Sequence, residues 1–516
     1  MLSRLTVHLR NGYNWPDLAG RPCARDENAN LPAGYTYLAQ FVAHDLVHSV
    51  APLPGLGEPT DDLARDFRAM RMVLETIYGG GPTARPGPYA IDGFPPERRR
   101  RLRLGHVPRA EPGFGTGVSA PMLDKPARDI PRAQCPYLND RGRQSATDAL
   151  IADPRNDDNL IVGQLTAMFH ELHNIVLDEV DRLAEAPHQG LDDFSAFRSF
   201  LAARKVVAYV YRGIVVNDLL KRMLHPAVHG FYTDPARSFP KDFADDPSAS
   251  GVPCEFSHAV FRFGHVMTRF NYPINDHFDS RLPGKLDASM KDILDRTSAR
   301  SLTLMPLACN WLVDWSRFFE LDRIPTYSRA IRPFTGRGHL TNNTYFPNEL
   351  ELDGGIFLLD MLRGVSAGVR TVSSLAARID PAFRAASPLL SDSAYRAHAI
   401  GKWLTQQRSA LHGSERQHAL ADDELALVSR DPPLFFYTLF EAADEAAGRR
   451  LGILGSVIVA EVVFGALHTT RAVIEGDRTL EDLVDRVFER NAPRDMPQLI
   501  RFIQRKGGLA AVDCGA

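Results

Sequence analysis

The sequence predicts a mainly α-helical protein with little β-structure, and three observations support this prediction. Apolar residues recur every three to four positions over long stretches, which is the spacing of one face of an α-helix. Alternating apolar and polar runs, the pattern of a half-buried strand, are scarce. The connecting segments contain many prolines and glycines without the composition of flexible linkers, so they predict long ordered loops. These loops cover 51–60, 79–96, 105–144, 234–254 and 332–355.

The helical pattern recurs from the first tenth of the chain to its C-terminus. In the clearest case, 157–183, Leu165 and Val176 belong to one apolar face. Asn156 or Asp157 can cap the first turn of that helix, where a carboxylate also suits the helix dipole. The segments predicted as helices are 35–50, 157–183, 194–224, the stretch around 265, 434–447, 451–467, 477–491 and 497–506.

The domain organisation follows from the absence of any composition shift or internal repeat. Although 516 residues are enough for several domains, no segment reads as a linker. We therefore predict one large helical domain over 31–470, preceded by an N-terminal extension, 1–30, and followed by helices packed on the same domain, 471–516. The most apolar stretch, 451–467, is short for a membrane span and contains Glu461, so it predicts a buried core helix and no transmembrane segment.

Composition and charge exclude several functional classes. A hydrophobic content of 44% and a charged content of 24% are ordinary for a globular protein, and a net charge of -3 gives no reason to expect nucleic acid or an anionic membrane as a partner. The basic run 97–103 is interpreted as solvated surface. The N-terminus lacks the apolar core of a secretory signal, and the scattered cysteines indicate no disulfide framework, so we expect a cytoplasmic location. The sequence leaves the oligomeric state open.

The stretch around His265 carries the most specific chemistry. Read as a helix, it places His258, Arg262, His265 and Arg269 on one face and several phenylalanines on another. Periodicity alone favours a helix with one solvated basic face. However, an imidazole one turn past an arginine can also ligate a metal while the guanidinium holds an anion. Haem, with its iron and two propionates, presents both partners.

Two further polar segments complete a chemical set. In 35–50, Gln40, His44 and His48 repeat at four-residue intervals on an otherwise apolar helix, and a buried polar face needs internal partners or a polar ligand. Arg155 lies in a charged junction before the long helix, where it could also be part of an ordinary cap. Heterolysis of a peroxide on iron needs a base that returns its proton and a guanidinium that stabilises the developing negative charge.

These segments resemble the signature segments of the animal-type haem peroxidases, the peroxidase–cyclooxygenase superfamily that includes myeloperoxidase. The run GYTYLAQFVAHDL at 34–46 is similar to the family's distal segment, and DPRNDDNL at 153–160 is similar to its catalytic-arginine segment in the form of the bacterial members. The runs FRFGH at 261–265 and LDMLRG at 359–364 resemble the proximal elements. The likeness extends from about residue 30 to 470. It implies a haem-dependent peroxidase that oxidises a small organic substrate or a halide through a ferryl intermediate.

The resemblance also implies a role for individual residues. His44 would be the distal acid and base and Arg155 its partner, with Gln40 one turn back, where halide or water binds in relatives. On the other side of the haem, His265 would ligate the iron and Arg262 would bind a propionate.

Asp360 would take the place of an asparagine that, in many relatives, hydrogen-bonds to the proximal imidazole. A carboxylate there makes the imidazole a stronger donor to the metal.

The implied cofactor is haem b, held without covalent bonds or by at most one ester through Asp158. Ala43 cannot form the other ester found in relatives, and Asn159 replaces the methionine that forms a sulfonium bond in myeloperoxidase. Calcium is a second cofactor to consider, because Asp45 matches a ligand of calcium-binding members, although the loop that would supply further oxygens does not align. The implied small-molecule partners are hydrogen peroxide and a reductant.

Two other functions stay open at this point. The chain could be a haem-binding scaffold without catalysis. It could also be a non-haem metalloenzyme, because His44 with His48 and His170 with His173 have spacings that place two ligands on one helical face. The second pair lacks the gap of the zinc-peptidase motif, and it is interpreted as one surface and one packing residue. Arg262 stands where the cyclooxygenase branch has its radical tyrosine, which argues against fatty-acid oxygenation by that route.

Overall fold

The computed structural model describes residues 1–10, 27–47, 72–91, 99–107, 128–133, 148–184, 193–234, 252–298, 300, 307–334, 355–411, 413–474 and 478–509. The predictions that concern His48 and most of the long loops lie outside these residues. The division into an extension, a main domain and terminal helices stays a prediction.

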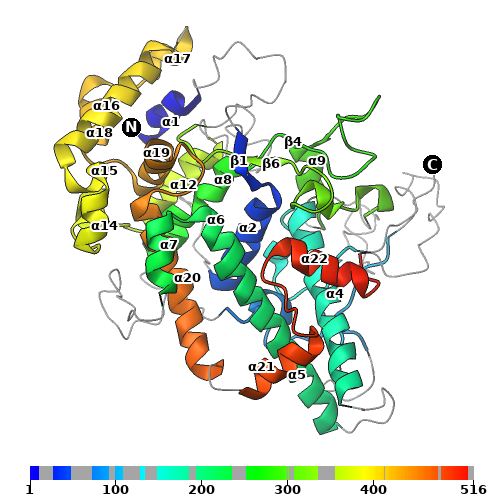
Figure 1. The fold of residues 1–516 in the computed structure, drawn as a ribbon. Helices are drawn as coiled ribbons and strands as arrows, with labels where there is room; N and C mark the ends of the chain where they lie inside the picture. Colours follow the sequence, from blue (N-terminus) through cyan, green and yellow to red (C-terminus); the bar gives the residue numbers. More distant parts are fainter. Residues whose placement is uncertain are drawn as a thin grey trace.

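The described part of the chain is mainly α-helical, as predicted (Figure 1). The helices of nine or more residues are α1 Leu2–Arg10, α2 Gly34–Leu46, α4 Leu160–Leu183, α5 Asp193–Ile214, α12 Gly355–Ser366, α16 Ser393–Ser409, α18 Asp422–Arg430, α19 Leu434–Ala446, α20 Ile453–Ile474, α21 Arg478–Val487 and α22 Met496–Arg505. No helix among the described residues is both long and apolar enough to cross a membrane.

Short elements connect these helices. The shorter α-helices are α3 Glu75–Tyr78, α6 Lys221–Met223, α7 Pro226–Thr233, α8 Gly264–Met267, α9 Met290–Asp295, α13 Val372–Ala376, α14 Pro381–Ala386, α15 Pro388–Ser391 and α17 Ser414–Gln417. The 3₁₀ turns are η3 Pro154–Asp157, η6 Val260–Phe263, η7 Cys309–Trp311 and η8 Trp315–Arg317, and the π-helical segments are η4 Val215–Leu220 and η5 Glu255–Ala259. Three antiparallel pairs make up the described β-structure: β1 Glu27–Pro32 with β6 Tyr327–Arg329, β2 Arg132–Ala133 with β3 Asp148–Ala149, and β4 Asn271–Tyr272 with β5 Ala288–Ser289.

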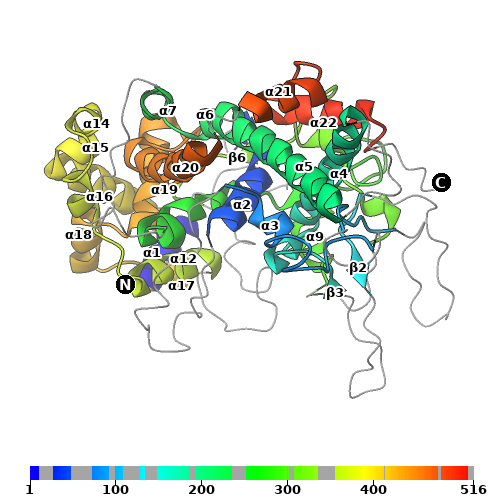
Figure 2. The same ribbon diagram turned by 90° about the horizontal axis from the view of Figure 1, so that it is seen from below.

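Helix α2 lies in the middle of the molecule, between α4 and α5 on one side and α19 and α20 on the other (Figures 1 and 2). All but two of its 13 residues are buried. Phe41 stacks on Phe169 of α4, with ring centroids 5.0 Å apart. Gly34 begins the helix at a point of close approach, because a Cβ there would lie 2.5 Å from the ring of Phe319. A helix buried on every side must satisfy its polar side chains within the protein or through a ligand.

Asp218 fastens the start of α2 to the C-terminal part of the chain. Its carboxylate accepts hydrogen bonds from the Tyr35 hydroxyl, at 2.7 and 2.9 Å, and from Nε of Arg222, at 2.8 Å. It also accepts from the backbone N–H of Met496, the first residue of α22, at 2.9 Å. Three segments far apart in the sequence therefore meet at one buried charge.

The predicted ends of two helices differ from the observed ones. Helix α2 ends at Leu46 and not at residue 50, because Val47 is extended, with φ -110° and ψ 128°. Helix α4 begins at Leu160, and its cap is Asn159, whose side chain accepts from two backbone N–H groups of the first turn. Asn156 and Asp157, the predicted caps, instead belong to the preceding 3₁₀ turn.

The stretch around His265 is not the regular helix that its periodicity predicts. It consists of π-helical η5, the 3₁₀ turn η6 and one α-helical turn, α8, with a break at Ala259, where φ is -134° and ψ is -78°. Phe256 and Phe261, five positions apart, stack with centroids 4.4 Å apart across this break. The single face proposed for four basic residues is therefore wrong, since Arg269 lies beyond α8 and binds Glu27.

The helices between 355 and 430 lie outside the predicted segments, and the longest of them, α16, has a weak periodic signal. In the 17-residue helix α16, only Arg396, Ile400 and Leu404 are buried. Arg396 looks like a surface residue in the sequence, but its guanidinium donates to the carbonyl of Leu389 and to the hydroxyl of Ser373. One basic residue in this narrow buried stripe conceals the pattern.

The interpretations of the basic run and of the cysteines also need correction. Within the basic run, Arg100 is buried and binds Asp181 of α4 at 2.8 Å, and Arg101 binds Asp178 of the same helix, so these arginines attach a connecting segment to α4. Cys309 is buried and disulfide-bonded. Since disulfides are uncommon in reducing compartments, this bond weakens the argument from the cysteines for a cytoplasmic location.

Candidate active site

His44 lies in the last turn of α2 and is held by an amide. Its Nδ1 is 2.9 Å from Oδ1 of Asn156, and both side chains are buried. The amide orientation is consistent with its second bond, in which Nδ2 of Asn156 donates to the carbonyl of Thr76. Because an amide oxygen only accepts, Nδ1 of His44 carries the proton and Nε2 keeps its lone pair. Sequence reasoning gave Asn156 no role beyond a helix cap.

Arg155 is tied to the same turn of α2. Its guanidinium donates to the carbonyl oxygens of His44, at 2.8 Å, and Val47, at 2.6 Å, which are acceptors left open by the end of the helix. Asp153 accepts two further bonds from Nε and Nη2. Burial by itself would raise the pKa of Asp153, but the hydrogen bonds and charge of Arg155 outweigh it and lower that pKa to about 2. The positive charge of Arg155 is therefore fixed beside His44.

The residues that follow Arg155 approach α2 as well. Nδ2 of Asn159 donates to Oε1 of Gln40 at 3.1 Å, so the residue one turn before His44 is linked to the start of α4. The carboxylate of Asp158 lies 3.9 Å from Nε2 of His44, beyond hydrogen-bond distance. Burial raises the pKa of Asp158 to about 7, although 54% of its side chain is exposed. Solvent at the exposed part of the side chain screens its charge, and Asp158 lines an accessible space.

A buried ion cluster supports this segment from behind. Both carboxylate oxygens of Asp157 accept from Arg132 at 2.9 Å, and one also accepts from the backbone N–H of Ser298 at 2.7 Å. Arg132 in turn binds Asp129 at 2.9 Å. These bonds fix the backbone from which Arg155 and its neighbours project. Because 105–144 is predicted as an ordinary loop, the sequence does not indicate that Asp129 and Arg132 support the Arg155 segment.

His265 is held by a carboxylate, in contrast to His44. Its Nδ1 lies 2.5 Å from Oδ2 of Asp360, which is fully buried on α12. Burial by itself would raise the pKa of Asp360, but the hydrogen bond to His265 and the charges of two arginines lower it. An ionised carboxylate accepts a hydrogen bond from Nδ1–H, which leaves Nε2 as the free electron-pair donor. The His265 side chain is 35% exposed, and no described residue hydrogen-bonds to its Nε2.

Arg262 and Arg363 bind the other oxygen of Asp360. Nη1 of Arg262 lies 3.2 Å from Oδ1, and Nη1 of Arg363 lies 3.7 Å from the same atom. The Nε atom of Arg262 is buried and has no hydrogen-bond partner among the described residues. Leaving a buried donor without a hydrogen-bond partner costs free energy. The Nε–H group of Arg262 is therefore available to donate to an anion such as a carboxylate. The predicted bond from Arg262 to a propionate stays a prediction.

The two histidine sites are neighbours in the fold, because α8 packs against α2. The structure thus brings together two groups of predicted residues. One contains His44, Gln40, Arg155 and Asp158, and the other contains His265, Arg262 and Asp360.

Comparison with known proteins agrees with this arrangement. The model of the animal haem peroxidase family matches residues 123–301, which include Arg155 and His265. A stretch of 118 residues is 34% identical to human thyroid peroxidase, and a stretch of 106 residues is 31% identical to heme peroxidase 2 of Caenorhabditis elegans. These matches support membership of the animal haem peroxidase family. The first match covers 22% of this chain and 12% of the human protein, and the second covers 20% and 14%.

Two solved structures share the fold of this chain. Peroxidase A from Dictyostelium discoideum superposes with a TM-score of 0.53 and 14% identity, over 99% of this chain and 90% of that one. The fatty acid alpha-dioxygenase of Arabidopsis thaliana superposes with a TM-score of 0.50 and 12% identity, over 94% of this chain and 74% of that one. At such identities the likeness establishes the architecture and leaves the reaction undetermined.

Haem, the cofactor that the family implies, fits the proximal side chains. His265 offers an Nε2 lone pair with an accessible surface, and its other nitrogen is polarised by Asp360. Arg262 offers a buried donor for a carboxylate. Metal-bound histidines usually have this kind of partner on the second nitrogen.

Calcium, in contrast, does not fit Asp45 as the described residues surround it. Its two carboxylate oxygens face the backbone N–H groups of Leu74 and Thr76, at 3.1 and 3.4 Å. A calcium ion needs six to eight oxygen ligands, and the described residues contain no group of three or more metal-binding side chains.

The second histidine pair does not form a metal site either. His170 and His173 are both fully buried, so the interpretation of one of them as a surface residue is wrong. Nδ1 of His170 lies 2.8 Å from the carbonyl of Arg103, and Nε2 of His173 lies 2.8 Å from that of Arg100. Burial lowers the pKa of each histidine to about 4, so both are neutral packing residues.

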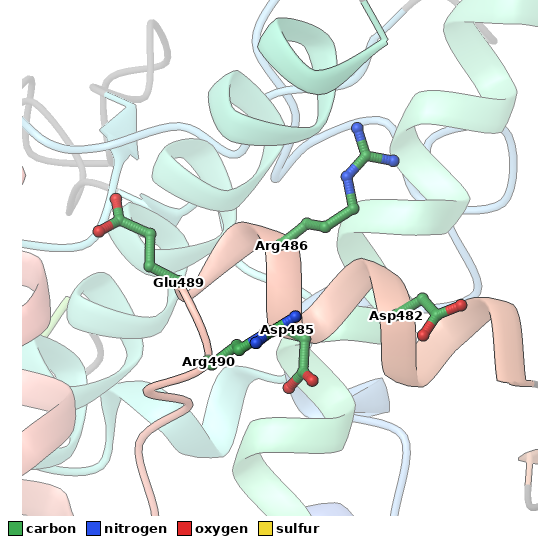
Figure 3. Close-up of a pocket in the computed structure, with 5 residues that line it drawn as sticks. All are labelled: Asp482, Asp485, Arg486, Glu489 and Arg490. Atoms are coloured by element: carbon green, nitrogen blue, oxygen red, sulfur yellow. The ribbon is translucent and has the colours of Figure 1, made fainter.

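A surface cavity of about 540 Å³ lies elsewhere, beside α21 (Figure 3). It is lined by charged side chains of α21 and the turn that follows: Asp482, Asp485, Arg486, Glu489 and Arg490. It contains no imidazole and none of the predicted site residues. Its chemistry therefore does not compete with that of the two histidine sites.

Proposed function

We propose that this protein is a haem peroxidase that uses hydrogen peroxide to oxidise a small organic reductant or a halide. One observation carries the proposal: two histidines on helices in contact are held through Nδ1 by partners of different charge. A neutral amide holds His44, and a carboxylate holds His265. Both arrangements leave Nε2 with its lone pair, but they suit different tasks.

The carboxylate partner suits metal binding. The negative charge of Asp360 beside Nδ1 increases the electron donation of Nε2, so His265 would bind the haem iron. Arg262 would hold a propionate through Nε, and Asp158 is the carboxylate at the position of an ester in relatives. We propose haem b held without covalent bonds, or by that one ester at most. When bound, the iron supplies the redox chemistry that takes up the oxidising equivalents of peroxide.

The amide partner suits proton transfer. A neutral imidazole is a base near pH 7, and Asn156 keeps the accepting lone pair on Nε2. His44 would take a proton from one oxygen of hydrogen peroxide and return it to the other oxygen, which leaves as water. The reductant then supplies two electrons and the remaining protons are taken up from solvent.

Arg155 would act by charge. A guanidinium stays protonated at any working pH and stabilises the negative charge on the departing oxygen. Four of its hydrogen bonds already bind Asp153 and the end of α2. It would therefore stabilise the charge mainly through its field and its remaining N–H group, and it would also hold His44 in place.

The test is a spectrum followed by stopped-flow kinetics. We expect the purified holoprotein to show a Soret band that changes on mixing with peroxide. His44→Leu should slow that change by about 10²–10⁴-fold, and Arg155→Leu by about 10²–10³-fold, while both retain haem. His277→Gln, at an exposed histidine, is the matched control and should react like the wild type.

The outcomes separate the remaining functions. Haem binding with equally slow peroxide reactions in the wild type and His44→Leu would favour a scaffold without catalysis. Failure to bind haem, together with stoichiometric zinc or non-haem iron, would favour the metalloenzyme. Guaiacol and iodide, offered as reductants, distinguish organic from halide oxidation.

A further inference from the structure

Asp45, the residue after His44, is surrounded by hydrogen-bond donors. It is 1% exposed. Oδ2 accepts from the N–H of Leu74 at 3.1 Å and Oδ1 from the N–H of Thr76 at 3.4 Å. Donor groups direct their positive ends at the carboxylate, whereas a calcium site surrounds the cation with oxygen atoms.

A guanidinium reaches the same turn. Nε of Arg212, in the last turn of α5, donates to the carbonyl of Met72 at 2.7 Å. Burial lowers the pKa of Arg212 to about 10, and the negative charge of Asp45 opposes this effect. Arg212 and Asp45 thus bind the backbone of the same turn, at Met72 and at Leu74. A cationic side chain therefore binds the same turn as Asp45, the residue whose position resembles that of a calcium ligand in calcium-binding relatives.

This cluster is connected to the distal imidazole. Thr76 donates its N–H to Asp45 and accepts from Nδ2 of Asn156 through its carbonyl. Oδ1 of Asn156 then accepts a hydrogen bond from Nδ1–H of His44. Since His44 and Asp45 are adjacent in the chain, these bonds close a ring that we call the distal ring: His44, Asn156, Thr76 and Asp45.

The backbone of the turn shows why an anchor is needed. Leu74 has φ +59°, in the left-handed region that a leucine rarely adopts. The Asp45 carboxylate accepts the N–H of this same residue. The strained turn is therefore held where the carbonyl of Thr76 can position Asn156.

We propose that this chain positions its distal histidine without calcium, because the N–H groups of the 74–76 turn bind Asp45 directly and the Arg212 guanidinium supplies the positive charge. Asp45 and Arg212 are positioning residues that act on His44 through the distal ring. This inference deepens the proposed peroxidase function, since the positioned side chain is the proposed acid and base.

The first measurement needs no catalysis. The holoprotein is dialysed against calcium chloride, then against calcium-free buffer, and its metal content is measured together with its thermal unfolding in EGTA or in excess calcium. We expect substoichiometric calcium and the same melting temperature in both solutions. Stoichiometric calcium, or a melting temperature that rises with calcium, overturns the proposal, because an ion that binds the folded state stabilises it. This result is informative even if the protein does not react with peroxide.

The second measurement tests the guanidinium. Arg212→Met should lower the melting temperature, and Arg212→Lys should restore part of the loss because it retains the charge. Arg198→Met, at an exposed position of the same helix, is the matched control and should match the wild type. If Arg212→Met and Arg198→Met have equal melting temperatures, Arg212 is not the replacement for a metal.

A third readout separates positioning from general stability. Cyanide binding to the ferric holoprotein needs a distal base, so its rate should fall about tenfold or more in Arg212→Met and recover in Arg212→Lys. A variant that is less stable but binds cyanide at the wild-type rate contradicts the positioning role. If Arg212→Met does not fold, the calcium content of the wild type and the behaviour of Arg212→Lys still decide the proposal.

Discussion

Replacement of Asn156 by aspartate changes the charge of the group that holds His44 and little else. In the wild type, the amide oxygen lies 2.9 Å from Nδ1. A carboxylate at that position favours the protonated imidazole. With charges about 4 Å apart and an effective dielectric constant of about 20, the attraction is about 4 kcal/mol. Since 1.36 kcal/mol corresponds to about one pKa unit, the upper limit of the effect is about three pH units.

The positive charge of Arg155 and the cost of burying a new carboxylate reduce this value. We expect the acid limb of the peroxide reaction to move about one to three pH units to higher pH in Asn156→Asp. The sign follows from the mechanism: only the neutral imidazole accepts a proton, and the new charge extends the protonated form to higher pH. The rate should be lower at neutral pH and approach the wild-type rate at alkaline pH.

The assay is a stopped-flow series of peroxide rate constants from acid to alkaline pH. Asn217→Asp, at an exposed asparagine on η4, adds the same charge away from His44 and is the control. An acid limb at the same pH in the wild type and in Asn156→Asp would refute the role of Asn156 as the partner of His44. A uniform decrease at every pH would indicate a structural defect.

Three further predictions concern the proximal side and stability. Asp360→Asn should retain haem but lower the ferrous iron–histidine stretching frequency in resonance Raman spectra and slow the peroxide reaction about 10–100-fold, whereas unchanged values would remove the carboxylate from the mechanism. Burial raises the pKa of Glu441 well above its ordinary value, so the stability that it contributes at low pH is lost as the pH rises. Denaturant titrations should show that the free energy of unfolding falls less steeply with rising pH in Glu441→Gln than in the wild type. His170 and His173 have pKa values lowered to about 4, so their contribution to folding stability is present above pH 6.5 and should be lost as the pH falls toward 4. A wild-type protein with the same midpoint of denaturant unfolding at pH 7 and pH 5 would contradict this.

The sequence was sufficient for the elements that a local signal defines. Helices α4, α5, α19 and α20 have long apolar periodicity and appear at or near their predicted positions. The stretch around His265 failed for a physical reason. Periodicity cannot distinguish an α-helix from a run of π and 3₁₀ turns, because all three bring residues three to five positions apart onto similar faces.

For the candidate site, the sequence identified groups that carry chemistry but missed those that orient them. Asp360 was found because it follows a recognisable segment, and it does contact His265. Asn156, Arg132 and Arg212 were missed, because their partners lie 112, 25 and 140 positions away in the chain. A residue whose role depends on a distant partner gives no pattern of its own in one sequence.

The contact made by Asp218 limits how this chain can be shortened or redesigned. Helix α22 supplies only a backbone N–H to that carboxylate, so side-chain substitutions in the first turn of α22 should leave the bond intact, whereas deletion of the helix removes it. A truncated form would leave a buried anion one donor short at the root of the helix that carries His44. Helix α22 therefore supports the start of the helix that carries His44, and a fusion partner belongs after α22 and not in its place.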